Sequence, residues 1–84
     1  MEIYLVQFEN GSWRLGFSEN ASDRVRRMPK KAEVKIFNLH DLEHFRIQCE
    51  DKLGEYKVKN QRCYAGNDPG VYKAIKSYLY IFSY

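Results

Sequence analysis

Basic side chains gather in one short stretch of this sequence. Residues 24–37 include six basic residues and one acidic residue, whereas residues 1–23 include one basic and four acidic residues. The basic residues of the stretch are Arg24, Arg26, Arg27, Lys30, Lys31 and Lys35. Because guanidinium and ammonium groups bind phosphate, these side chains could form a phosphate-binding stripe that contacts DNA. The alternative is the ordinary one, a solvated basic face of a helix.

Histidines and cysteines offer a second kind of chemistry. His40 and His44 have a spacing at which two imidazoles on one helix can share a metal ion, and Cys49 or Cys63 could complete a zinc site. The signal is weak, because the sequence has no Cys-x-x-Cys or His-Glu-x-x-His motif. Nothing in the sequence indicates an oxidising compartment, so we expect two reduced thiols.

Length and composition set the frame for these residues. A chain of 84 residues has room for one domain with a small core, and its 44% hydrophobic and 15% aromatic content is too high for a disordered tail. No apolar run approaches the roughly 20 residues of a membrane-spanning helix, and the N-terminus lacks a basic region before an apolar one. We therefore expect a single domain over residues 1–84, no membrane contact and a cytoplasmic location.

A β-hairpin is predicted at the N-terminus. Residues 3–8 are almost continuously apolar, which suits a strand covered on both faces. Asn10 and Gly11 favour a tight turn, after which residues 12–18 can pair back. Asn20 can cap a short helix that Pro29 ends, and alternation over residues 32–39 predicts a third strand.

The second half of the chain is predicted to be mainly helical. Apolar residues recur at helical spacing over residues 41–53, and Asp68 followed by Pro69 begins a final helix. Residues 55–63, where apolar residues alternate with lysines, are expected to form an extended edge segment. The predicted fold class is α+β, with a small three-stranded antiparallel sheet, made of the hairpin plus one strand, packed with about three helices.

The order of these elements resembles the GIY-YIG nuclease domain in its minimal phage-type form. Ile3 and Tyr4 precede the hairpin turn, Leu15 and Gly16 follow it, and Arg24 comes eight positions after that glycine. Leu42 and Glu43 open a helix where the family has its metal-binding glutamate. As an arrangement of elements, the resemblance extends over nearly the whole chain.

The resemblance implies a phage or mobile-element endonuclease that cleaves phosphodiester bonds in DNA with one divalent ion. Tyr4 would activate or orient water, and the guanidinium of Arg24 would bind the phosphate. Glu43 would hold Mg²⁺ or Mn²⁺, with Glu50 as the substitute carboxylate. Arg14 would add a further contact to DNA.

The sequence also departs from the family at several motif positions. Glu2 stands where the family has glycine, Arg14 where it has a second tyrosine, and Met28 where many members have histidine. These departures support a second hypothesis, a catalytically inactive member of the fold. Such a protein would bind or inhibit a host defence protein or nuclease.

Arg14 discriminates between the two hypotheses. A two-residue turn at Asn10 and Gly11 would put Arg14 and Tyr4 on opposite faces of the sheet, whereas a longer turn would bring them to one face. We predict the longer turn, because the family's site needs both motif positions on the same face. Opposite faces would favour the binding protein.

Overall fold

A computed structural model describes residues 1–39 and 41–82 of the chain. Along the chain the elements are β1 (Glu2–Phe8), β2 (Trp13–Ser18), α1 (Ala21–Arg26), β3 (Lys31–Phe37), α2 (Leu42–Lys52), the short 3₁₀ helix η1 (Gly54–Tyr56), β4 (Cys63–Gly66) and α3 (Pro69–Phe82). Among residues 1–39 and 41–82, none of the helices combines the length with the apolar character that a membrane span requires.

The sheet has four antiparallel strands in the order β3-β1-β2-β4. The α+β class is thus confirmed, but the prediction of a three-stranded sheet is wrong. Residues 63–66 form the additional strand, in which Tyr64 lies opposite Leu15 of β2. The predicted edge segment over residues 55–63 is also wrong in its bounds. η1 occupies its beginning, Lys57 makes an isolated bridge to Tyr64, and of this segment Cys63 alone belongs to β4. A four-residue strand is too short to show a period of two in the sequence.

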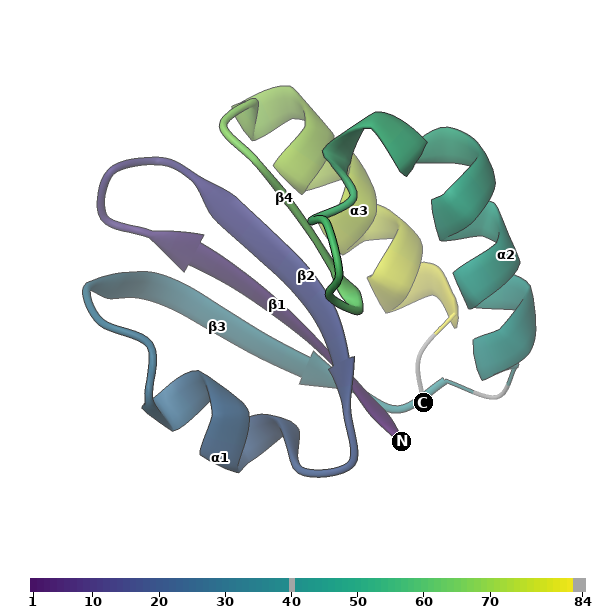
Figure 1. Ribbon diagram of the computed structural model, residues 1–84, viewed down its shortest axis with the longest axis horizontal. Coiled ribbons are helices and arrows are strands. Elements are labelled where there is room, and N and C mark those ends of the chain that lie inside the picture. Colours follow the sequence, from purple (N-terminus) through teal and green to yellow (C-terminus); the bar gives the residue numbers. More distant parts are fainter. Residues whose placement is uncertain (40, 83–84) are drawn as a thin grey trace.

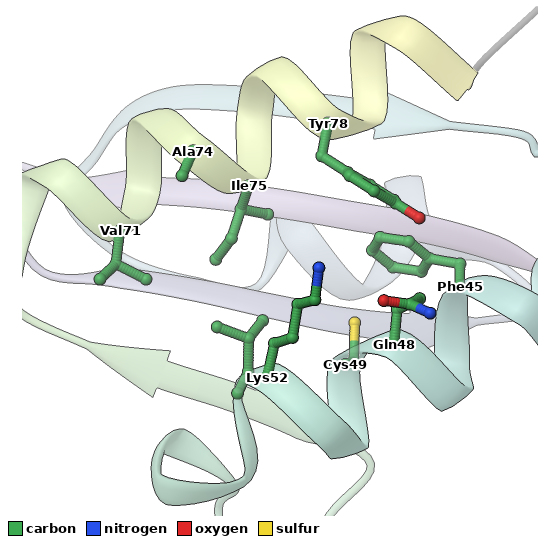
Figure 2. Close-up of a pocket in the computed structure, with 9 residues that line it drawn as sticks. Phe45, Gln48, Cys49, Lys52, Val71, Ala74, Ile75 and Tyr78 are labelled. Carbon is green, nitrogen blue, oxygen red and sulfur yellow. The ribbon is translucent and has the colours of Figure 1, made fainter.

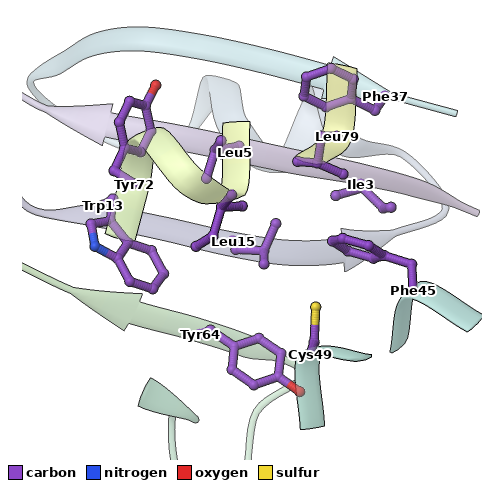
Figure 3. Packing of buried hydrophobic residues seen from close by; sticks show 11 residues of the cluster. Ile3, Leu5, Trp13, Leu15, Phe37, Phe45, Cys49, Tyr64, Tyr72 and Leu79 are labelled. Carbon is purple, nitrogen blue, oxygen red and sulfur yellow. The ribbon is translucent and has the colours of Figure 1, made fainter. Parts of the chain in front are cut away.

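Helices cover both faces of this sheet (Figure 1). Strand β1 is central, and its alternating side chains enter two separate cores. Ile3 and Leu5 belong to the larger core on the side of α2 and α3, which Figure 3 shows. Tyr4 and Val6 belong to a smaller core that includes Ala21 and Val25 of α1. Burial on both faces explains the continuous apolar run of β1, as the sequence predicted.

The hairpin turn is longer than two residues. The Phe8 backbone N–H donates to the carbonyl of Ser12 at 2.8 Å, so residues 9–11 form the loop, and Gly11 has φ +89°. Gly11 therefore supplies the left-handed conformation that ends this kind of three-residue turn. In the resulting register Tyr4 lies opposite Gly16 and Arg14 opposite Val6. The prediction of the longer turn is confirmed, and Tyr4 and Arg14 leave the same face of the sheet.

Each of the three α-helices begins at a polar residue at or next to the start that the sequence indicates. The Asn20 side chain accepts a hydrogen bond from the Asp23 backbone at 3.1 Å, and Asp41 accepts one from His44 at 2.9 Å. Asp68 accepts one from the Gly70 backbone at 2.8 Å. These caps satisfy N–H groups that have no partner within the first helical turn.

Candidate functional site

Three of the residues singled out in the sequence converge on the α1 face of the sheet. Tyr4 lies on the central strand and is 1% exposed. Arg14 is half-buried on β2, and Arg24 is an exposed residue of α1. Both guanidinium groups act on the Tyr4 hydroxyl, since the charges of both and a hydrogen bond from Arg24 influence its pKa. We call Tyr4, Arg14 and Arg24 the tyrosine–arginine cluster.

Gly16 leaves the space that the Tyr4 ring occupies in this cluster. A Cβ atom on Gly16 would lie 2.2 Å from both Cζ and the hydroxyl oxygen of Tyr4. No side chain larger than hydrogen fits there without moving the ring, because real Cβ contacts are much longer. Glycine at position 16 is therefore required by the close approach of Tyr4.

The Tyr4 hydroxyl is held in its neutral form. Burial raises the pKa of Tyr4 above its ordinary value of 10.0 and Cys63 raises it further, whereas the charge and hydrogen bond of Arg24 and the charge of Arg14 lower it. Burial prevails, so the phenol keeps its proton at neutral pH. Tyr4 can thus donate a hydrogen bond to a water or a phosphate oxygen, but it does not supply a phenolate base.

Arg14 has an unusual environment for a cation. Its Nε atom is buried and has no hydrogen-bond partner within residues 1–39 and 41–82. A buried, charged N–H group without a partner is costly, and an anion bound beside it would remove that cost. This unpartnered donor makes the tyrosine–arginine cluster a candidate site for an oxyanion.

The predicted basic stripe is divided in the structure. Arg26 and Arg27 are exposed, and both form ion pairs with Asp23, that of Arg27 at 3.2 Å. Lys31 donates to the Met28 carbonyl, which ties the end of the α1 segment to β3. Lys30 is also exposed, and of the two arginines of α1 it is Arg24 that influences the pKa of Tyr4.

Lys35 is separated from the other basic residues of the stripe. It belongs to the face of β3 that α3 covers, where its ammonium lies 5.9 Å from the centre of the Tyr80 ring. The hydrogen bond and charge of Tyr80 raise the pKa of Lys35 above its ordinary value. Lys35 therefore adds nothing to the phosphate-binding potential of the tyrosine–arginine cluster.

Glu43 is not brought to the tyrosine–arginine cluster. It lies on α2, whose buried Phe45 belongs to the core on the opposite face of the sheet from Tyr4. Its side chain is 75% exposed and lies 3.8 Å from Arg46. Glu50, the substitute carboxylate, is an exposed residue of the same helix. Neither residue fits a divalent-ion site at Tyr4.

Other metal ligands are also dispersed. Among residues 1–39 and 41–82, no three histidine, cysteine or acidic residues come together in a way that could hold a metal ion. Cys49 and Cys63 are free and buried, and His44 is exposed. His40 lies outside the described residues, so the zinc site stays a prediction.

Two residues that sequence reasoning did not assign to the site also lie on the α1 face. Cys63 of β4 is opposite Gly16, and its proximity to Tyr4 contributes to the pKa of that hydroxyl. Glu2 accepts a hydrogen bond from the backbone of Ala21 at 3.0 Å and so ties the start of β1 to α1. Glu2 had a signal in the sequence, since it is an acidic residue at the start of an otherwise apolar strand, whereas the position of Cys63 depends on the pairing of β4.

A second concave feature lies on the other side of the sheet, between α2 and α3 (Figure 2). This groove of about 330 Å³ is lined mainly by apolar side chains, and Lys52 reaches across it toward α3. Cys49 lies at its base, and burial together with the Glu50 charge raises the pKa of the Cys49 thiol to about 12. None of the other residues that line the groove is charged, so none of them neutralises Lys52. These residues are Phe45, Gln48, Cys49, Leu53, Val71, Ala74, Ile75 and Tyr78.

Comparisons of the chain with protein-family models, with curated proteins and with solved structures found no match.

Proposed function

We propose that this protein acts on DNA and binds the phosphodiester backbone at the tyrosine–arginine cluster. The observation that carries the proposal is the buried Nε of Arg14, a cationic donor without a partner in the described chain. Arg24 supplies a second guanidinium beside the same hydroxyl. Two guanidinium groups around a neutral phenol suit a phosphate group, because arginine offers several donors to its oxygens.

Endonucleolytic cleavage is the reaction that the resemblance to the GIY-YIG nucleases adds to this proposal. Arg14 and Arg24 would hold the scissile phosphate and stabilise negative charge that develops on it. Tyr4 would orient the attacking water or a phosphate oxygen by donating a hydrogen bond. No step is assigned to a divalent ion here, since Glu43 and Glu50 lie on the other helical layer.

The test is nicking of supercoiled plasmid with Mg²⁺ or Mn²⁺, combined with measurement of DNA binding without metal. We expect Arg14→Ala and Arg24→Ala to weaken both, and Tyr4→Phe to reduce nicking while retaining binding, because phenylalanine keeps the ring against Gly16. Arg26→Ala is the matched control, since Arg26 is an exposed arginine of the same helix that pairs with Asp23. Equal DNA affinity of the native protein and the Arg14 and Arg24 variants would refute the proposed binding site.

A non-catalytic binding protein is the second candidate. Two observations favour it: Arg14 replaces the second motif tyrosine, and Glu43 is remote from Tyr4. In this case the native protein would not nick plasmid with either ion, and immobilised protein would retain a stoichiometric protein from host lysate. Recovery of nucleic acid alone would count against this candidate.

A further inference from the structure

The two edges of the sheet differ in how they are protected. Beside β4, Lys57 makes a bridge to Tyr64, and the Val58 N–H donates to the Cys63 carbonyl at 3.0 Å. Beside β3, no further strand lies at the outer edge within residues 1–39 and 41–82 (Figure 1). An unpaired edge is a template for another strand.

The hydrogen bonds of the hairpin show which groups of β3 point outward. The Phe8 N–H donates to Ser12, which precedes β2, and the direction of the backbone groups alternates along a strand. In β1 the backbone groups of even-numbered residues therefore form hydrogen bonds with β2, and those of odd-numbered residues form them with β3. Leu5 lies opposite Lys35, and Gln7 lies opposite Glu33. Lys35 and Glu33 consequently direct their backbone groups to β1, and the backbone groups of Val34 between them point to the free edge.

The side chains of β3 also alternate between its two faces. Val34 and Ile36 lie on the α1 face and are each 37% exposed, a large fraction for apolar residues of a strand. Glu33 and Lys35 lie on the α3 face, where they carry opposite charges two positions apart. An irregularity at the start of the strand, between the pairs of Gln7 and Phe8, limits the regular edge to residues 33–37.

We propose that β3 is a self-association surface, which pairs antiparallel with β3 of a second copy of this chain around a two-fold axis at Val34. In this register Val34 lies opposite Val34 of the second copy, and their outward backbone groups exchange two hydrogen bonds. Glu33 lies opposite Lys35 of the second copy, and Lys35 opposite Glu33. Each dimer therefore contains two close pairs of opposite charge.

Charge selects this register over its neighbours. A neighbouring register keeps the hydrogen bonds between outward backbone groups only if one strand is shifted by two residues along the other. A shift in one direction places Glu33 opposite Glu33 of the second copy, and a shift in the other direction places Lys35 opposite Lys35. Like charges directly opposite each other destabilise a strand pair. Glu33 can take the new partner, because its hydrogen bonds from Tyr72 and Lys76 both use Oε1, and Oε2 has no hydrogen bond or ion pair in the part of the chain that the structure describes.

The dimer would join the two sheets into one. A two-fold axis perpendicular to the sheet puts α1 of both copies on the same side, so both tyrosine–arginine clusters would face in one direction. The exposed Val34 side chains would meet at the axis and become buried. This pairing does not depend on the proposed action on DNA.

Sedimentation velocity of the full chain over a wide range of concentration tests the proposal. We expect reversible association to twice the monomer mass of 10.0 kDa. Val34→Pro should abolish it, because proline removes the outward N–H at the axis, which makes no bond to β1. Circular dichroism would verify that this variant remains folded. A native chain that stays monomeric, or a folded Val34→Pro variant that still dimerises, would overturn the proposal.

Charge reversal tests the register. Lys35→Glu alone and Glu33→Lys alone should each weaken self-association by about tenfold or more, because both charged pairs become like pairs. A mixture of the two variants should form a heterodimer, since every facing pair is then of opposite charge. Lys31→Glu is the matched control, with the same change of net charge on the same strand outside residues 33–37. Equal weakening by Lys31→Glu and Lys35→Glu would refute the register, even where Glu33→Lys fails to fold.

Discussion

The ring of Tyr4 lies directly across Gly16, so closely that a Cβ atom at Gly16 would be 2.2 Å from the phenol oxygen. The two residues face each other on adjacent strands, and each comes from one of the two motifs that suggested the family resemblance. Their contact fixes the position of the hydroxyl, whose pKa the charges of both Arg14 and Arg24 lower. Gly16 and Tyr4 are thus one structural unit.

Gly16→Ala should destabilise the protein and displace Tyr4. The added methyl group overlaps a fully buried ring, and overpacking of this kind costs about 1–3 kcal/mol. Urea denaturation measures the change. Gly54→Ala is the matched control, because a Cβ atom at Gly54 meets no atom within 4 Å. Equal stability of the two variants would show that Tyr4 does not occupy the space in front of Gly16.

Arg24→Ala should change the salt dependence of DNA binding as well as the affinity. If Arg24 contacts one phosphate, its removal lowers the slope of log affinity against log salt by about 1. Fluorescence anisotropy of a labelled duplex at several salt concentrations measures this slope. The Arg26→Ala variant should have a slope closer to that of the native protein than the slope of the Arg24→Ala variant is. An unchanged slope for Arg24→Ala would place the phosphate contacts elsewhere.

Glu33 should contribute stability that disappears in acid. Hydrogen bonds from Lys76 and then Tyr72 hold the pKa of Glu33 below its ordinary value of 4.5. Because the pKa is lowered in the folded state, the contribution of the Glu33 carboxylate to the free energy of unfolding is complete above pH 4.5. It is lost as the pH falls through the lower pKa that Glu33 has in the folded state. We expect Glu33→Gln to cost about 1 kcal/mol at neutral pH, since the carboxylate is one-third exposed.

Urea denaturation of dilute native protein and of Glu33→Gln, from neutral pH into acid, measures this difference. The two curves should approach each other as the pH falls below 4.5 and converge below the lowered pKa that Glu33 has in the folded state. Glu55→Gln, at an exposed glutamate of η1, is the control and should change stability little at any pH. A difference that persists at the lowest pH would contradict the ionic origin.

The Cys49 thiol should be unreactive in the folded protein. Burial raises its pKa to about 12 from 9.0, so at neutral pH almost none of it is thiolate. The folded protein holds the thiol proton more tightly than the unfolded chain does. The contribution of Cys49 to the free energy of unfolding is therefore complete below pH 9.0 and is lost as the pH rises from 9.0 toward about 12. In a Cys63→Ala variant, a disulfide reagent should label Cys49 far more slowly in buffer than in denaturant. Equal rates would indicate that Cys49 is accessible.

Much of the secondary structure follows from short-range patterns. The apolar run of β1, the side-chain cap of Asn20, and Asp68 before Pro69 each act within a few residues of the chain. The turn required one further argument, because Asn10 and Gly11 alone fit a two-residue loop. Its actual length emerged from requiring Tyr4 and Arg14 on one face, which the register confirms.

The sequence by itself determined which segments alternate, which are covered on both faces and where helices begin, because these properties depend on local hydrogen bonds and on side-chain period. Only the tertiary structure decided that Tyr64 pairs with Leu15, that Glu43 lies across the sheet from Tyr4, and that Lys35 lies away from the rest of the basic stripe. Each of these depends on contacts between segments far apart in the chain. Such contacts are selected by the packing of the whole core, which no local window of sequence contains.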